Sequence, residues 1–140
     1  MVVIDTNIVS ELMRSEPSTV VLAWMDDRPA RELFVTAITE AEVRTGIAVL
    51  PEGRRRRGLG EACERAFGSL FAGRVLPFDS GAARAYAEIV SARRVLGRPV
   101  SQADCQIAAI ACARGMAVAT RNVRGFEDMG IEILDPWNAA

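Results

Sequence analysis

The chain has 140 residues, of which half are hydrophobic and a quarter are charged, and its formal net charge is −1. This composition predicts one globular domain, residues 1–140, with enough apolar side chains to form a core, and it argues against a disordered protein. The nearly neutral charge gives no general attraction to nucleic acid, so any contact with a phosphate backbone has to be local.

Two amino acids are absent, and each absence removes a class of mechanism. The chain contains no histidine, and all 17 of its basic residues are arginine. Without histidine there can be no Ser-His-Asp triad, no histidine acid–base ribonuclease chemistry and no histidine zinc site. Without lysine there can be no Walker A phosphate loop and no Schiff-base catalysis. If the chain is an enzyme, we therefore expect it to use carboxylates and a metal ion.

The cysteines and the hydropathy indicate the compartment. Cys63, Cys105 and Cys112 are odd in number and lack the C-x-x-C spacing, so we expect reduced, packed thiols in a cytoplasmic protein. No apolar run is long enough to cross a bilayer, and the N-terminus lacks a basic segment followed by a hydrophobic one. We therefore expect neither a membrane protein nor a secreted precursor.

Five short apolar runs have the composition of buried strands. They alternate with helical patterns along the chain, which predicts a mainly parallel sheet of about five strands in a three-layer α/β/α sandwich. The predicted strands are residues 2–4, 32–38, 74–78, 117–120 and 131–134.

Helical patterns separate these strands. The first has an apolar stripe of Ile8, Leu12 and Met13, and Asn7 is its expected N-cap. The most apolar pattern runs from residue 102 to about residue 114, behind Ser101 as a cap, and predicts a central buried helix. The other expected helices start at Ser18, Thr39 and Asp79, and one more spans residues 59–71.

Three acids and one amide occupy comparable points of this predicted fold. Asp5 follows the first strand, Glu42 lies early in the helix after the second, Asp104 lies in the first turn of the central helix, and Asn122 follows the fourth strand. Because the carboxyl ends of parallel strands share one edge of the sheet, we expect all four side chains at that edge, where ligands bind.

Each acid also has a purely structural explanation. Asp5 can cap a helix or a turn, and Thr39-x-x-Glu42 and Ser101-x-x-Asp104 fit the capping-box pattern or an acidic variant of it. Three carboxylates about 5 Å apart would repel by about 3 kcal/mol per pair at an effective dielectric near 20. That is a large part of the roughly 5–15 kcal/mol by which a domain is stable. Such a cluster has to take up protons or bind a cation, and oxygen ligands select Mg²⁺ or Mn²⁺ over zinc.

The order of these motifs resembles that of PIN-domain proteins, of the VapC/FitB type of bacterial toxin ribonuclease. The matching stretches are Asp5-Thr6-Asn7 with Ser10-Glu11-Leu12, Thr39-x-x-Glu42-x-x-x-Gly46, Asp104 with the apolar helix behind it, and Thr120-Arg121-Asn122. The resemblance covers essentially the whole chain and is closest to FitB-like members. Some relatives carry an aspartate at the fourth motif, where this chain has Asn122. Because a neutral amide can still bind a water or a phosphate oxygen, we expect activity with weaker binding of a second metal ion.

The resemblance implies a Mg²⁺-dependent endoribonuclease, with Mn²⁺ as the alternative ion, in which carboxylates hold one or two ions that activate a water. It implies Asp5 and Asp104 as direct metal ligands and Glu42 as a direct or water-mediated one, and it adds Asn122 to the catalytic set. The supporting and substrate-binding residues are then Thr6, Asn7, Thr120 and Arg121. The products would carry 5′-phosphate and 3′-hydroxyl ends because the nucleophile is water.

The resemblance also implies partners. The chain would be the toxin of a type II toxin–antitoxin pair, a homodimer with RNA as substrate, a cognate antitoxin, and contact with DNA only through that antitoxin. A second hypothesis, from a different class, is a catalytically weak PIN-like module that acts mainly by docking its antitoxin in operon regulation.

The run Arg54–Arg57 is the most conspicuous group of charges. Cations at a helix N-terminus oppose the helix dipole, so local stability does not explain the run. It can be a solvated loop, a phosphate track for RNA or a contact for a partner, and we expect the loop. Arg121 is the better candidate for touching a substrate phosphate. Trp24, Tyr86 and Trp137 are expected in the core or an interface rather than stacked on bases.

Overall fold

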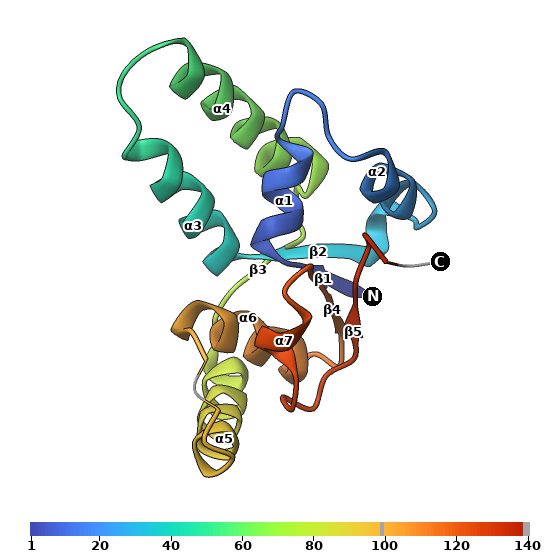
Figure 1. Cartoon of the computed structure of the whole chain (residues 1–140), viewed down its shortest axis with the longest axis vertical. Helices are drawn as coiled ribbons and strands as arrows, with labels where there is room; N and C mark the ends of the chain where they lie inside the picture. The colour runs from blue at the N-terminus through green and yellow to red at the C-terminus, as the bar shows by residue number, and fades with distance from the viewer. Residues whose placement is uncertain (99, 139–140) are drawn as a thin grey trace.

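The computed structural model describes residues 1–98 and 100–138, and its centre is a five-stranded, all-parallel sheet with the strand order β3-β2-β1-β4-β5 (Figure 1). The predicted parallel sheet of about five strands is therefore confirmed. All strands except the first are shorter than the apolar runs that predicted them. The strands are β1 (Val2–Ile4), β2 (Leu33–Thr36), β3 (Val75–Leu76), β4 (Ala117–Ala119) and β5 (Ile133–Leu134).

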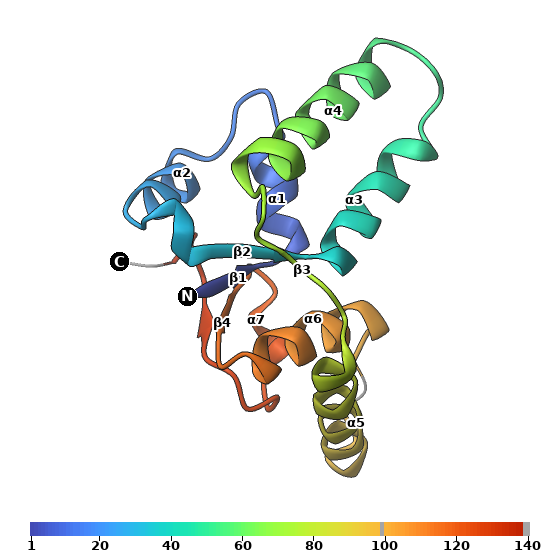
Figure 2. The same cartoon turned by 180° about the vertical axis from the view of Figure 1, so that it is seen from behind.

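Helices cover both faces of this sheet, with α1 to α4 on one side and α5 to α7 on the other, so the predicted three-layer α/β/α sandwich is confirmed (Figures 1 and 2). The helices are α1 (Thr6–Leu12), α2 (Thr19–Asp26), α3 (Ala37–Ala48), α4 (Arg54–Arg65), α5 (Ser80–Val95), α6 (Gln102–Ala113) and α7 (Val123–Phe126). A 3₁₀ turn, η1 (Ala30–Glu32), precedes β2, and a π-helical turn, η2 (Ala66–Leu70), continues α4.

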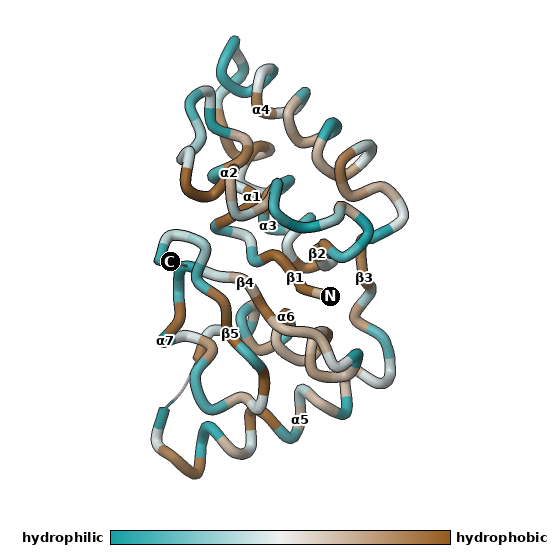
Figure 3. The backbone as a smooth tube through the Cα atoms, turned by 90° about the vertical axis from the view of Figure 1, so that its right-hand side faces the viewer, coloured by the Kyte–Doolittle hydropathy of each residue, from teal (hydrophilic) through white to brown (hydrophobic). Residues whose placement is uncertain are grey.

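Side chains of β1 reach both layers because successive residues of a strand point to opposite faces. Val2 and Ile4 pack in the core under α1, α2 and α4, whereas Val3 packs with α5, α6 and α7. Figure 3 shows the apolar β1 and β4 in the middle of the molecule. The central helix α6 is buried along residues 107–111, as predicted.

The boundary between β1 and β4 is where the direction of strand addition reverses. The chain places β2 and β3 on one side of β1 and then returns to place β4 on the other side. In open α/β sheets, ligands bind in the crevice beyond the carboxyl ends of the strands at such a switch point. The ladder continues one residue past β1, because the Asp5 backbone N–H donates to the Ala119 carbonyl oxygen at 2.9 Å. Asp5 is therefore fixed at the switch point.

Two helix caps differ from the prediction. Asp5, not Asn7, is the N-cap of α1. The helix after β2 starts two residues earlier than expected, because the Thr36 hydroxyl caps it by accepting from the Thr39 backbone N–H at 3.1 Å. Glu42 therefore lies in the second turn of α3, and the capping-box explanation for Glu42 is wrong. The predicted caps Ser18, Asp79 and Ser101 are confirmed.

Three further expectations need correction. Arg54–Arg57 form the first turn of α4 rather than a loop. The short helix α7 was not predicted, because four residues are too few to show a helical period. Cys63 and Cys105 are packed as expected, but Cys112 is exposed. In the described part of the chain, no helix combines the length and the apolar character that crossing a membrane requires.

Candidate functional site

Asp5 lies at the centre of the site because it ends β1 and caps α1 at the same time. Its Oδ1 accepts a hydrogen bond from the Thr6 backbone N–H at 2.7 Å. Its Oδ2 accepts from the Thr120 hydroxyl at 2.7 Å and from Asn7 Nδ2 at 3.2 Å. Only 3% of its surface is exposed. The capping role proposed as the structural alternative is therefore real, but it uses only one of the two carboxylate oxygens.

Burial makes the charged form of Asp5 unfavourable. It raises the pKa of the Asp5 carboxyl from 3.8 to about 6, against the opposing effect of the hydrogen bonds from Thr120 and Thr6. The negative charges of Asp104 and Glu42 raise this pKa further. The three predicted acids are thus close enough to act on one another.

Thr6 connects Asp5 to Glu42. The Thr6 hydroxyl donates to Glu42 Oε1 at 2.6 Å, since an ionised carboxylate can only accept. This uses the only hydroxyl proton of Thr6, so Thr39 must be the donor in the 3.0 Å contact between the Thr39 and Thr6 hydroxyls. Thr36 in turn donates to the Thr39 hydroxyl at 3.4 Å. A row of three threonine hydroxyls therefore leads from the buried end of β2 to the exposed Glu42.

Thr120 connects Asp5 to the other side of the site. Its hydroxyl donates to Asp5 and accepts from Asn7 Nδ2 at 3.2 Å and from the Asn122 backbone N–H at 2.9 Å. Asn122 Nδ2 donates to Asp104 Oδ2 at 3.3 Å. A continuous line of polar contacts thus runs from Glu42 through Asp5 to Asp104.

Asp104 lies in the first turn of α6, whose cap is the Ser101 hydroxyl, which accepts from the Asp104 backbone N–H at 3.1 Å. The Asp104 side chain faces Asn122. Partial burial raises the pKa of the Asp104 carboxyl, and the charge of Glu42 raises it further, while hydrogen bonds from Ser101 and Asn122 oppose the rise. The predicted cap and the predicted position at the sheet edge are therefore both present.

Gly125 is a site residue that the sequence reasoning missed. A Cβ at this position would lie 2.3 Å from Asn122 Nδ2 and 3.1 Å from Asp104 Oδ2. The contact between Asn122 and Asp104 therefore needs a residue without a side chain at position 125. A glycine three residues after Asn122 was the available sequence signal, but it could be interpreted only once α7 was known.

The eight predicted site residues do not all point to the same place. The structure brings together the acids, Thr6, Asn7, Thr120 and Asn122 through the contacts above. Arg121 donates its backbone N–H to Asn7 Oδ1 at 3.3 Å, but its guanidinium carbon lies 4.7 Å from the centre of the Trp137 ring. Its side chain therefore stacks on an aromatic residue that itself packs against the core.

Comparison with known proteins identifies the family of this chain. The profile of the PIN domain matches residues 2–132. The chain belongs to the PIN-domain family. The toxin FitB of Neisseria gonorrhoeae is 38% identical over 138 residues, which is 99% of each chain. A VapC ribonuclease of Sinorhizobium fredii is 44% identical over 140 residues, the whole of both chains. One solved structure, FitAB bound to a DNA fragment, contains a chain with a TM-score of 0.92 and 38% identity, covering all of this chain and 98% of that one. The predicted resemblance to VapC and FitB is confirmed.

The donors of this PIN domain suit a hard divalent cation. They are carboxylate, amide and hydroxyl oxygens, and Mg²⁺ is commonly held by one or two carboxylates together with waters. The three hydrogen bonds to Asp5 leave one of its roughly four acceptor positions open. Within residues 1–98 and 100–138, no three acidic or sulfur-containing side chains lie close enough together to hold an ion as they stand. An ion at this site would therefore be held by carboxylate oxygens together with waters.

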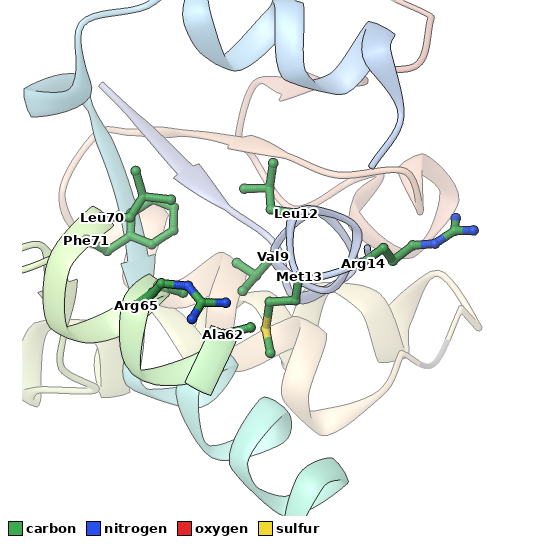
Figure 4. A pocket seen from close by; sticks show the side chains of 9 residues that line it. Val9, Leu12, Met13, Arg14, Ala62, Arg65, Leu70 and Phe71 are labelled. Atoms are coloured by element: carbon green, nitrogen blue, oxygen red, sulfur yellow. The ribbon is translucent and has the colours of Figure 1, made fainter. Parts of the chain in front are cut away.

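Two hollows lie beside α1, one facing α3 and α4 and the other facing α4 and η2. One is lined by Thr6 and Glu42 of the acid site together with Arg14 and Arg55. Most residues that line the other are apolar: Val9 and Leu12 of α1, with Met13 just after it, face Phe71 and its neighbours across the hollow (Figure 4). Arg14 and Arg65 also line this second hollow, which we call the α1–α4 groove.

Proposed function

We propose that this PIN-domain protein is a Mg²⁺-dependent endoribonuclease and the toxin of a type II toxin–antitoxin pair. The observation that carries the proposal is Asp5, a buried carboxyl with a raised pKa that is hydrogen-bonded toward Glu42 on one side and Asp104 on the other. Relatives that span the whole chain are named a ribonuclease and a toxin.

In this proposal, Asp5 and Asp104 hold the ion and Glu42 joins them directly or through a water. When bound, the ion supplies an activated water and neutralises charge on the reacting phosphate. The chain's own polar residues keep the acids in place. Thr6 orients Glu42, Thr120 holds Asp5, and Asn122 holds Asp104 through hydrogen bonds.

Substrate contacts follow from what borders the acids. Arg14 and Arg55 line the same hollow as Glu42 and offer guanidinium groups to the phosphates of a bound RNA. Thr6 and Asn7, at the start of α1, and Thr120 are the polar groups beside the acids. The Arg121 side chain can contact the substrate only if it moves off the Trp137 ring.

The experiment is cleavage of a labelled single-stranded RNA by the purified protein, in EDTA and after addition of Mg²⁺ or Mn²⁺. We expect no cleavage in EDTA, restored cleavage with either ion, and products with 5′-phosphate and 3′-hydroxyl ends. Full activity in EDTA, or products ending in a 2′,3′-cyclic phosphate, would contradict a metal-activated water as nucleophile.

The alternative function, a binding module that works through its antitoxin, has its own observation in the α1–α4 groove. Its apolar lining with two arginines suits an apolar helix that carries acidic residues, which is how we propose that an antitoxin docks. Binding of the antitoxin by a protein that cleaves no RNA under any metal condition would favour this second function.

We further propose, from the relatives alone, that the protein is a cytoplasmic homodimer that reaches DNA only through its antitoxin. Solved structures of FitAB and of a VapBC from Salmonella typhimurium are described as DNA-bound. Sedimentation of the purified chain tests the dimer, and a DNA-binding measurement with and without the antitoxin tests the indirect contact.

A further inference from the structure

The hollow that Glu42 shares with Arg14 and Arg55, which we call the Glu42 hollow, also has an apolar wall. Guanidinium groups can bind the phosphates of an RNA, but apolar side chains cannot replace the water around a phosphate. The function proposed above therefore leaves this wall unexplained. It consists of Met13, Val43, Ile47, Leu50 and Leu59.

Gly46 lies beside this wall and next to the acid site. It lines the Glu42 hollow and follows Glu42 by four residues within α3. Residues four apart in a helix lie on the same face, one turn above the other. A side chain at position 46 would therefore stand on the face of α3 that carries Glu42, over the hollow.

The fold of α3 does not require a glycine at position 46. The φ angle of Gly46 is not positive, and a Cβ built on this residue meets no atom within 4 Å. In the interior of a helix, glycine is less favourable than every other residue except proline. An alanine would therefore suit the helix better, and the glycine calls for an explanation outside folding.

Open space beside a helical glycine does not by itself indicate a site. Gly58 and Gly60 of α4 have equally open surroundings. Gly46 differs because it adjoins a hollow that has both a site acid and an apolar wall. Without a Cβ, the helix backbone at Gly46 can be approached closely by a ligand.

A nucleobase of RNA matches this hollow in size and in chemistry. The volume of the hollow is about 330 Å³, at the lower end of the roughly 300–1,000 Å³ of clefts that bind small molecules. Every base has a flat face that packs on apolar side chains, and proteins that recognise single-stranded RNA bind bases that have left the stack. The base would belong to a nucleotide whose phosphate lies near Glu42.

We propose that the Glu42 hollow receives one unstacked base of the substrate RNA, with the face of the base against Gly46 and the apolar wall. A base that is paired in a double helix cannot enter, so the hollow selects single-stranded RNA. This inference rests on the proposed function, since it takes RNA as the substrate. It assigns Gly46 to substrate recognition, separate from the acids that hold the ion.

The test is the affinity for a fluorescently labelled single-stranded RNA of mixed sequence, measured by anisotropy in EDTA at several salt concentrations. We expect Gly46→Leu, which places a side chain in the hollow, to weaken binding at least about tenfold, since the packing of a base on a protein is of that order. Gly46→Ala should weaken binding less. The slope of log K against log salt should stay unchanged, because an apolar contact releases no counterions. Both variants should unfold at a higher Tm than the unchanged protein, because alanine and leucine favour a helix.

Gly60→Leu is the matched control. Gly60 also lies within a helix with no atom within 4 Å of its Cβ position, but it lines a different hollow, beside Arg56 and Arg57. This variant should bind RNA as the unchanged protein does. Equal affinity of Gly46→Leu and Gly60→Leu would overturn the base site, and so would a loss in Gly46→Leu that flattens the salt slope, because that loss would indicate a phosphate contact. If the unchanged protein binds no single-stranded RNA, the proposed function fails as well.

Discussion

Like charges gather in two regions of the molecule: Asp5, Glu42 and Asp104 at the carboxyl edge of the sheet, which we call the acid edge, and Arg54–Arg57 in the first turn of α4. The two regions differ in how far their charges are buried and hydrogen-bonded. At the edge, Asp5 is buried, accepts three hydrogen bonds and has its pKa raised to about 6. On α4, Arg54, Arg55 and Arg57 are exposed, and none of the four arginines forms an ion pair within the described residues.

The difference shows which charges call for a functional explanation. A buried carboxylate destabilises the fold unless something neutralises it, so its presence needs a reason beyond folding. An exposed arginine has little effect on the stability of the fold. A run of exposed arginines in the sequence is therefore weak evidence for a functional site. The experiments below test whether the two regions differ in function as they do in burial.

The largest effect is expected for Asp104→Asn, which keeps the shape of the side chain. RNA cleavage should fall more than about 100-fold, because changes behind a metal ligand already cost roughly 10–100-fold. The metal-free protein should be as stable or slightly more stable, since a charge that raises the pKa of Asp5 is removed. Asp79→Asn, which changes the cap of α5, is the control and should keep activity. A large loss of stability in Asp104→Asn would instead indicate a structural capping role.

Asp5 should make the metal-free protein depend on pH. Its pKa rises from 3.8 to about 6 on folding, so the folded state holds this proton more tightly than the unfolded state. The resulting stabilisation is fully present below about pH 4 and is lost as the pH rises through 6, up to about 3 kcal/mol. Urea unfolding in EDTA should therefore show Asp5→Asn gaining stability over the unchanged protein between pH 4 and pH 7. If the difference in unfolding free energy between Asp5→Asn and the unchanged protein does not vary with pH, ionisation of Asp5 does not destabilise the folded protein.

Gly125→Ala should lower RNA cleavage less than Asp104→Asn does, also by disturbing Asp104. The added Cβ would displace the Asn122 amide from Asp104, so we expect cleavage to fall about tenfold, at the low end for a residue that orients a metal ligand. Gly81→Ala is the matched control, because its Cβ meets no atom nearer than 3.5 Å. Equal activity of the two variants would contradict the proposal that Asn122 holds Asp104 in place for cleavage.

The arginine run should give the smallest effect, and the helix divides it into two pairs. Arg54 and Arg55 line a hollow with Arg14 and Arg65, whereas Arg56 and Arg57 line another, beside the end of α3. If the first pair contacts RNA, changing both residues to Gln should flatten the slope of log K against log salt by about 1.4, at about 0.7 per contact. The same change at Arg56 and Arg57 is the control. Equal slopes in both double variants would leave the run as a solvated surface.

The sequence predicted the architecture because the apolar runs and helical periods are strong, local signals. It also predicted that Asp5 and Asn122 lie near each other, because each follows a strand at the carboxyl edge of the parallel sheet. Asp104 reaches the same edge on α6, which follows another helix, and it contacts Asn122. The sequence could not predict the roles of residues that depend on exact side-chain contacts. Thr39 was interpreted as the start of a helix, and only the position of Thr36 as the cap shows that its hydroxyl instead faces Thr6.

Arg93 and Gly125 show the same limit. Nothing in the pattern around Arg93 distinguishes it from Arg94, yet one is buried and the other exposed. The close approach at Gly125 depends on α7, which is too short for its period to be recognised.

The central claim is that the acid edge holds a divalent cation, and thermal unfolding in increasing Mg²⁺ tests it most directly. At 100 times the dissociation constant, a bound ion adds about 2.7 kcal/mol of stability, which raises the Tm by roughly 8 °C for a domain of this size. We predict this rise for the unchanged protein and for Asp79→Asn, and its absence in Asp5→Asn and Asp104→Asn. No rise in the unchanged protein, or the same rise in all four proteins, would contradict a metal site at Asp5 and Asp104.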